Sequence, residues 1–125
     1  MNKRITPRER GLLKGAIRRV FSRSELRNSI ITASIVKHSD PSRPRVKVWA
    51  KCAACGKPDA KSYMAVDHID PVIPPNSSFE ELGLDGTVDR LWCDPENLQA
   101  ICEECHSTKT KAEAKERKAR KKAKK

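Results

Sequence analysis

The N-terminal part of the chain places its apolar residues with the period of an α-helix. From Pro7 to about Val36 they recur at offsets of one, three and four, which predicts amphipathic helix. A first stripe consists of Leu12, Leu13, Ala16, Ile17, Val20 and Phe21, and a weaker second stripe of Leu26, Ile30, Ala33 and Ser34. Ser22 or Ser24 can cap a new helix. We therefore predict two short helices with a break near Ser22.

Two strand-like runs follow a turn. Two prolines in the segment 40–44 exclude a regular helix, so it is predicted to be a turn or linker. Residues 46–51 alternate in the manner of a short strand, and residues 63–69 form a second strand-like run. Residues 71–92 are predicted to form a long loop with a helical turn around Phe79–Leu82.

The end of the chain returns to a helical pattern. A helix is predicted to begin near the Cys102–Cys105 pair and to continue through Glu113 and Glu116. The closing sequence KERKARKKAKK has low complexity and is predicted to be disordered. The chain thus divides into a basic helical segment with linker (1–45), an α+β core (46–116) and a basic tail (117–125).

Charge is distributed unevenly along these segments. Residues 1–51 carry 14 lysines and arginines against 3 acidic residues, residues 52–106 carry 3 against 11, and residues 107–125 carry 10 against 2. Basic arms favour a nucleic-acid partner, because neutralising phosphates releases counterions. A membrane is disfavoured, since no run of about 18 apolar residues exists to span one. The acidic centre would repel DNA unless a cation lay between them, which indicates a divalent metal.

Composition and cysteine usage point to a metal-stabilised intracellular protein. Only 37% of the residues are hydrophobic and 4% aromatic, so apolar burial alone would be thin and a metal would help stability. The N-terminus is basic but lacks the apolar core of a signal peptide, which predicts a cytoplasmic location. In a reducing compartment, paired cysteines are more often metal ligands than disulfides.

Four of the five cysteines form two C-x2-C pairs, Cys52/Cys55 and Cys102/Cys105. This spacing lets two thiolates of a tight turn grip one tetrahedral ion, and four thiolates satisfy a structural Zn²⁺. Gly56 suits the left-handed residue of such a turn. The pairs lie farther apart than in ordinary zinc ribbons, so two unrelated pairs or a redox C-x2-C remain alternatives. Cys93 is read as a small apolar side chain or, alternatively, a regulatory thiol.

A candidate catalytic set lies beside the cysteines. Asp67 and His68 lie between the two pairs, and His106 directly follows the second pair. A zinc ion that joins the pairs would also bring these residues together. A carboxylate and an imidazole can hold Mg²⁺ or Mn²⁺ in a half-open site, which leaves His68 to act as a base.

The ordered set resembles the HNH nucleases, in particular small phage and prophage members with two flanking C-x2-C pairs. The resemblance covers residues 46–113 and rests on Asp67-His68 ahead of Pro71, Asn97-Leu98 before C-x2-C, and His106 with Lys109-Thr110 behind it. It implies the ββα-metal fold, in which two strands and a helix hold one catalytic cation. The chain departs from compact members in the long segment between His68 and Asn97, which leaves open whether Trp92 belongs to the second strand.

The resemblance also implies a role for each residue. His68 would be the general base that activates water for attack on a DNA phosphodiester, and Asp67 and His106 would bind the catalytic Mg²⁺, Mn²⁺ or Ni²⁺. Asn97 would constrain the loop that orients His68. Asp70 is either a water-mediated second ligand or a turn residue. Contacts to double-stranded DNA are expected from Lys109, Thr110, Arg18 and Arg19, although the basic helix face can equally be merely solvated.

The sequence is compatible with more than one biological role. The resemblance is compatible with a homing or restriction-like enzyme, or with a partner of phage packaging proteins in a bacterial host cell. The alternative from another class is a non-catalytic zinc-knuckle protein that binds nucleic acid. The target sequence, nicking versus double-strand cleavage and the oligomeric state are not encoded in any readable pattern.

Overall fold

The computed structural model of the chain describes residues 4–123, and their side chains as far as residue 119. Its elements are, in order, α1 (Pro7–Ser22), α2 (Glu25–Ala33), β1 (Ile35–Val36), β2 (Trp49–Lys51), β3 (Pro58–Ala60), the 3-10 turn η1 (Lys61–Tyr63), β4 (Ala65–His68), α3 (Phe79–Leu91), the 3-10 turn η2 (Pro95–Asn97), β5 (Leu98–Ile101) and α4 (Glu103–Ala123). The predicted α+β class is therefore confirmed.

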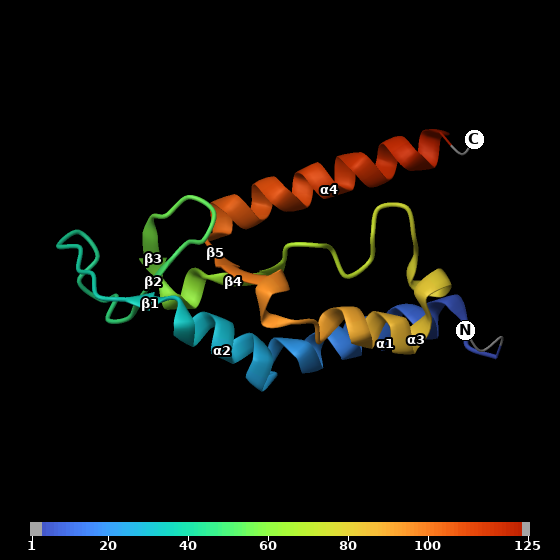
Figure 1. Cartoon of the computed structure of the whole chain (residues 1–125), viewed down its shortest axis with the longest axis horizontal. Helices are drawn as coiled ribbons and strands as arrows, with labels where there is room; N and C mark the ends of the chain where they lie inside the picture. The colour runs from blue at the N-terminus through green and yellow to red at the C-terminus, as the bar shows by residue number, and fades with distance from the viewer. Residues whose placement is uncertain (1–3, 124–125) are drawn as a thin grey trace.

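The strands form two small antiparallel sheets. One sheet has the order β1-β2-β3, and the other pairs β4 with β5 so that Asp67 lies opposite Gln99 and His68 opposite Leu98. Figure 1 shows α4 along one side of the elongated molecule and α1 and α2 along the other, with β4 and β5 between them. The strands β4 and β5, which α3 separates in the chain, and the helix α4 thus form a strand–strand–helix unit.

The predicted pair of N-terminal helices is confirmed. Thr6 begins α1 with a capping box, in which its side chain accepts from the Glu9 N–H and the Glu9 carboxylate accepts from the Thr6 N–H. Ser24 caps α2 by accepting from the Arg27 N–H at 3.2 Å. Because a capped helix start cannot continue the preceding helix, the chain breaks between Ser22 and Glu25.

The N-terminal helices share their core with the rest of the chain. One cluster of buried side chains joins Phe21 of α1 to Val72, Ile73, Phe79, Leu91 and Leu98. A second cluster joins Ile31 of α2 to Ala50, Cys52, Met64, Ala100 and Ile101. Ile30 and Val66 pack against both clusters. The apolar stripe predicted for α1 is buried only in part, since Leu12 and Val20 are 60% and 62% exposed.

The predicted loop over residues 71–92 is wrong in its second half. Residues 79–91 form α3, which begins at the cap Ser78, and Trp92 ends this helix instead of joining a strand. The helix is kinked at Gly83, where φ is +73°, and this kink interrupts the apolar period on which the prediction depended. Phe79, Thr87 and Leu91 nevertheless anchor it in the core.

The basic tail is also more regular than its composition predicts. Helix α4 continues to Ala123, so residues 117–123 are helical, and only the last two residues of the predicted disordered tail lie outside the described part. Lysine, arginine, alanine and glutamate all favour helix, which explains the continuation. Among residues 4–123, no helix combines the length and the apolarity that a membrane crossing requires.

Candidate functional site

Four cysteines converge where the two sheets meet. Cys52 directly follows β2 and Cys102 directly follows β5, and an Ala53 N–H bond to the Ala100 carbonyl, 2.8 Å long, ties the two turns together. The four sulfur atoms lie within 4.8 Å of one another. Gly56 has φ of +77° and donates to the Cys52 carbonyl at 2.9 Å, which closes the first turn as predicted. The cluster can hold a structural metal ion such as zinc.

The protonation of the cluster explains why a cation would stabilise it. Burial raises the pKa of Cys52, but N–H donors of Cys55, Cys102 and Ala54 outweigh this effect and lower it to about 6. The hydrogen bond with Cys102 is the largest of the effects that raise the pKa of Cys105 to about 12. Burial and the nearby sulfur atoms of Cys52 and Cys55 act in the same direction. One thiolate thus suppresses ionisation of its neighbours, and a bound cation would remove that repulsion.

A cavity of about 330 Å³ lies between α1, β4, the segment 71–73 and α4. It contains the candidate residues Asp67 and His68 of β4 and His106 and Thr110 of α4. Its other lining residues are Arg18, Val66, Pro71, Val72, Ile73, Glu113 and Arg117. The cavity thus joins carboxylates, imidazoles and guanidinium groups from three elements distant in sequence.

His68 is held in one orientation at the end of β4. Its Nε2 lies 2.9 Å from the Leu91 carbonyl, and its ring lies against Phe21 with centroids 5.1 Å apart. Because a carbonyl only accepts, Nε2 carries the proton and Nδ1 keeps its lone pair. Burial and the charges of Arg18 and Lys109 lower the pKa of His68, although the Leu91 bond and Asp67 act in the opposite direction. The imidazole is therefore neutral at pH 7.

Asp67 is paired with Lys109, for which the sequence predicts a contact to DNA. Its Oδ2 accepts from Lys109 Nζ at 2.7 Å and from Gln99 Nε2 at 3.0 Å. Lys109 also reaches Glu113 at 3.1 Å and the carbonyls of His68 at 2.5 Å and Ile69 at 3.3 Å. Burial lowers the pKa of Lys109, but bonds to Asp67 and Glu113 outweigh this and raise it. The Lys109 ammonium group therefore connects α4 to Asp67 and His68 at the end of β4.

Asn97 fixes the turn that follows His68. Its Oδ1 accepts from the Asp70 N–H at 2.8 Å, and its Nδ2 donates to the Asp70 carbonyl at 3.3 Å. The Asn97 carbonyl accepts from the Ile69 N–H at 2.8 Å. Asn97 also donates to Cys93 Sγ at 3.6 Å, which places this half-buried cysteine against the same turn.

Two arginines that the sequence did not single out hold the next residues of this loop. Arg90 donates to the carbonyls of Val72 at 2.6 Å and Pro71 at 2.7 Å, and pairs with Asp70 at 3.1 Å. Arg117 of α4 donates to the Ile73 carbonyl. Nothing in the sequence separates these arginines from the solvated ones, because their acceptors are backbone groups of a distant loop.

The remaining candidate residues differ in their positions. Arg18 and Thr110 line the cavity, whereas Arg19 is exposed outside it and Asp70 turns away to Arg90. His106 lines the cavity and donates its backbone N–H to the Cys102 carbonyl at 2.9 Å, which couples it to the cysteine turn. Within the described residues, no other three cysteine, histidine or acidic donors gather as the four cysteines do.

The chain stands apart in comparisons with known proteins. No family model, no curated protein and no solved structure matches it.

Proposed function

We propose that the protein is a metal-dependent endonuclease that hydrolyses DNA phosphodiester bonds, with the cavity between β4, α1 and α4 as its active site. The observation that carries this proposal is the meeting of Asp67, His68 and His106 with Arg18 and Arg117 in one cavity. General base, cation ligands and phosphate-binding groups are the three components that such hydrolysis requires.

The residues of the chain divide the chemistry among themselves. Neutral His68 takes a proton from the attacking water at Nδ1, because the Leu91 carbonyl holds Nε2–H. Arg18 and Arg117 attract the phosphate and favour the transition state, in which negative charge on its oxygens increases. Asn97 keeps the turn after His68 closed, so that the imidazole does not move during proton transfer.

Asp67 and His106 are the residues that would hold the catalytic cation. One carboxylate oxygen and one imidazole nitrogen form a mixed donor set that accepts Mg²⁺, Mn²⁺ or Ni²⁺. Both bonds that Asp67 already makes end on Oδ2, so Oδ1 remains for a cation. A cation in this position supplies Lewis-acid stabilisation of the phosphate and the leaving 3′-oxygen.

The order of the elements supports the same proposal. The strands β4 and β5 and the helix α4 have the chain order that the resemblance to HNH nucleases implies. Cys102 of the cysteine cluster lies between β5 and α4. In this proposal zinc at the four cysteines has an architectural role, and the exchangeable cation belongs to the cavity.

The test is cleavage of supercoiled plasmid by zinc-loaded protein dialysed against metal-free buffer. Added Mg²⁺, Mn²⁺ or Ni²⁺ is expected to restore nicking or linearisation, whereas buffer alone is expected to give none. If the purified protein cleaved the plasmid with none of these cations, the proposal would be overturned.

A second candidate function is favoured by the Lys109–Asp67 pair. An ammonium group 2.7 Å from the carboxylate already neutralises it, so that Asp67 would need no cation. The chain would then be a zinc-knuckle protein that binds nucleic acid without cutting it. This candidate predicts retention of plasmid in a gel-shift assay with no change in topology after incubation with divalent cations. The same plasmid assay therefore distinguishes the two candidates.

A further inference from the structure

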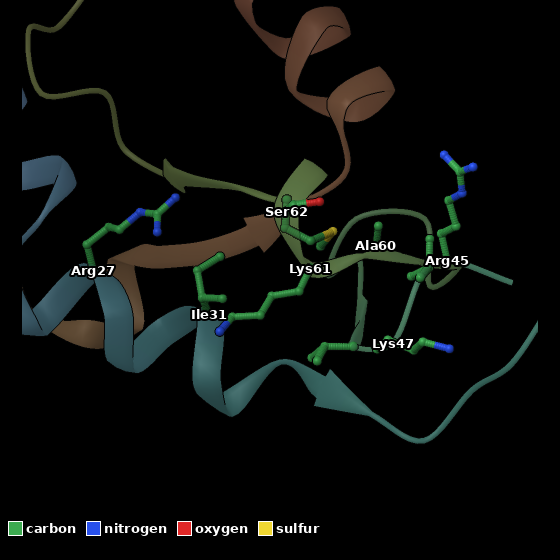
Figure 2. Close-up of a pocket in the computed structure, with 10 residues that line it drawn as sticks. Arg27, Ile31, Arg45, Lys47, Ala60, Lys61 and Ser62 are labelled. Atoms are coloured by element: carbon green, nitrogen blue, oxygen red, sulfur yellow. The ribbon is translucent and has the colours of Figure 1, made fainter. Parts of the chain in front are cut away.

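A second hollow lies between α2 and the three-stranded sheet, away from the candidate active site (Figure 2). It has a volume of about 570 Å³, and three buried apolar side chains line it: Ile31, Ala60 and Met64. We call it the basic groove, because four of its ten lining residues are cationic and none is acidic. The cationic residues are Arg27, Arg45, Lys47 and Lys61.

The four cations of the basic groove lack acidic partners within the described residues. Arg27 contacts the Asn28 amide oxygen at 3.5 Å, and Lys47 donates to the Pro44 carbonyl at 3.2 Å. By contrast, Arg10, Arg43, Arg90 and Lys109 each pair with a carboxylate. Like charges without counter-charges repel one another, and a polyanion in the groove would relieve this repulsion.

The cations are spread over the groove and do not converge on one point. Figure 2 shows Arg27 on α2 at one side, the Lys61 side chain reaching from the middle towards Ile31, and Arg45 and Lys47 at the other side with their side chains directed away from Arg27. A small anion needs donors that converge on it. Cations spread over the length of a groove suit a chain of phosphates, which carries its charges at intervals.

The segment that carries Arg45 and Lys47 is fixed before any ligand binds. Arg43 pairs with Asp59 of β3 at 2.9 Å and lies over the rings of Trp49, at 5.1 Å, and Tyr63, at 5.7 Å. The Val46 N–H donates to the Arg43 carbonyl at 3.2 Å. Little ordering of this segment would accompany binding, which lowers the cost of association.

We propose that the basic groove binds the sugar–phosphate backbone of a nucleic acid, as a site separate from the catalytic cavity. The binding itself does not depend on whether the cavity is catalytic.

The position of the groove adds a prediction that rests on the proposed function. Met64 in the groove directly precedes β4, and His68 at the other end of β4 lines the cavity. A strand rises about 3.3 Å per residue, so roughly 13 Å separates the two positions. A duplex advances about 3.4 Å per base pair. For a duplex that runs along β4, the groove would therefore hold backbone roughly four base pairs to one side of the cut.

The test is fluorescence anisotropy with a labelled DNA duplex and the full chain, loaded with zinc and without other divalent cations. Each lost phosphate contact weakens binding about eightfold at 0.1 M salt and makes the negative slope of log K against log salt shallower by about 0.9. The double variant Lys47→Ala/Lys61→Ala is therefore expected to bind about sixtyfold more weakly, with a slope that is shallower by about 2.

The matched control is Lys37→Ala/Lys57→Ala, which removes two exposed lysines outside the groove. It has the same net charge as the groove variant and is expected to bind within about threefold of the unchanged protein. Equal weakening in both variants, or unchanged binding in the groove variant, would overturn the proposal. The proposal would also be overturned if the unchanged protein bound both duplex and phosphatidylserine vesicles and the groove variant bound only the duplex. The groove would then be a membrane-binding site. Failure of plasmid cleavage would leave this binding test unaffected.

Discussion

His68, the general base of the proposed function, lies in surroundings that favour its neutral form. Burial and the nearby cations Arg18 and Lys109 lower its pKa, and the folded protein therefore binds this proton less readily than the unfolded chain. The resulting contribution to stability is present above the unfolded value of about 6.5 and is lost as the pH falls through the lower folded value.

The pKa of His68 can be measured without reference to activity. In an NMR titration of histidine-labelled protein, the His68 resonance is expected to show a midpoint below about 6.5. Comparison with the His68→Gln variant assigns the signal among the three histidines. A midpoint at or above the ordinary value would mean that desolvation does not dominate at this residue.

Lys109 determines how the end of β4 is attached to α4. Its partner Asp67 has a side chain only 11% exposed, so removal of the ammonium would leave a largely buried carboxylate without its charge partner. Lys109→Met is expected to lower the free energy of unfolding by about 1–3 kcal/mol in urea denaturation.

Lys115→Met provides the control for that measurement, because Lys115 is exposed on the same helix. Its effect is expected to stay within about 0.5 kcal/mol. If the two variants were equally stable, the Lys109–Asp67 pair would not be part of the structural framework.

At the level of the elements, the cysteine turns join β2 to β5 and so connect the two sheets. Metal binding and folding are coupled at such sites, since the ligands assemble only in the folded chain. Cys55→Ser is the sharpest variant, because Cys55 is exposed and its replacement disturbs little packing. We expect it to lose the cysteine-bound zinc and to unfold at a lower temperature, as measured by elemental analysis and circular dichroism.

Cys93→Ser is the matched control, since Cys93 lies outside the cluster and accepts only from Asn97. It should retain one zinc ion per chain. Equal zinc content in Cys55→Ser and Cys93→Ser would exclude the four-cysteine site.

The elements that could be predicted from the sequence are those with local signals. The cap Ser24 and the C-x2-C turns each involve residues within four positions of one another. Helix α3 has no clear apolar period across Gly83 and exists because Phe79 and Leu91 reach a core built by α1 and β5. The Lys109–Asp67 pair and the bonds from Arg90 to the carbonyls of Pro71 and Val72 join distant segments, so no local pattern could have predicted them.

At the level of the whole molecule, α1 contributes to the candidate site as well as to the core. Arg18 lines the cavity proposed as the active site, and Phe21 packs on His68 and Trp92. Phe21→Ala is expected to cost about 3–5 kcal/mol of stability, because it opens a cavity in the larger cluster. Thermal unfolding should still show one transition, since α1 and β5 belong to the same core.

Leu12→Ala tests the same helix on its exposed side. Leu12 is 60% exposed, so its truncation is expected to change stability by less than about 0.5 kcal/mol. Two separate transitions in the Phe21→Ala protein would show that α1 folds independently of the strand–strand–helix unit.

The assignment of catalysis to the cavity depends on His68 more than on any other residue. The measurement that decides it compares single-turnover cleavage of plasmid DNA by the unchanged protein, His68→Ala and His38→Ala, at equal zinc content. We expect His68→Ala to be slower by about 10²–10⁴ and His38→Ala, altered at a histidine outside the cavity, to cleave at the normal rate. Normal cleavage by a folded, zinc-loaded His68→Ala protein would show that the base lies elsewhere.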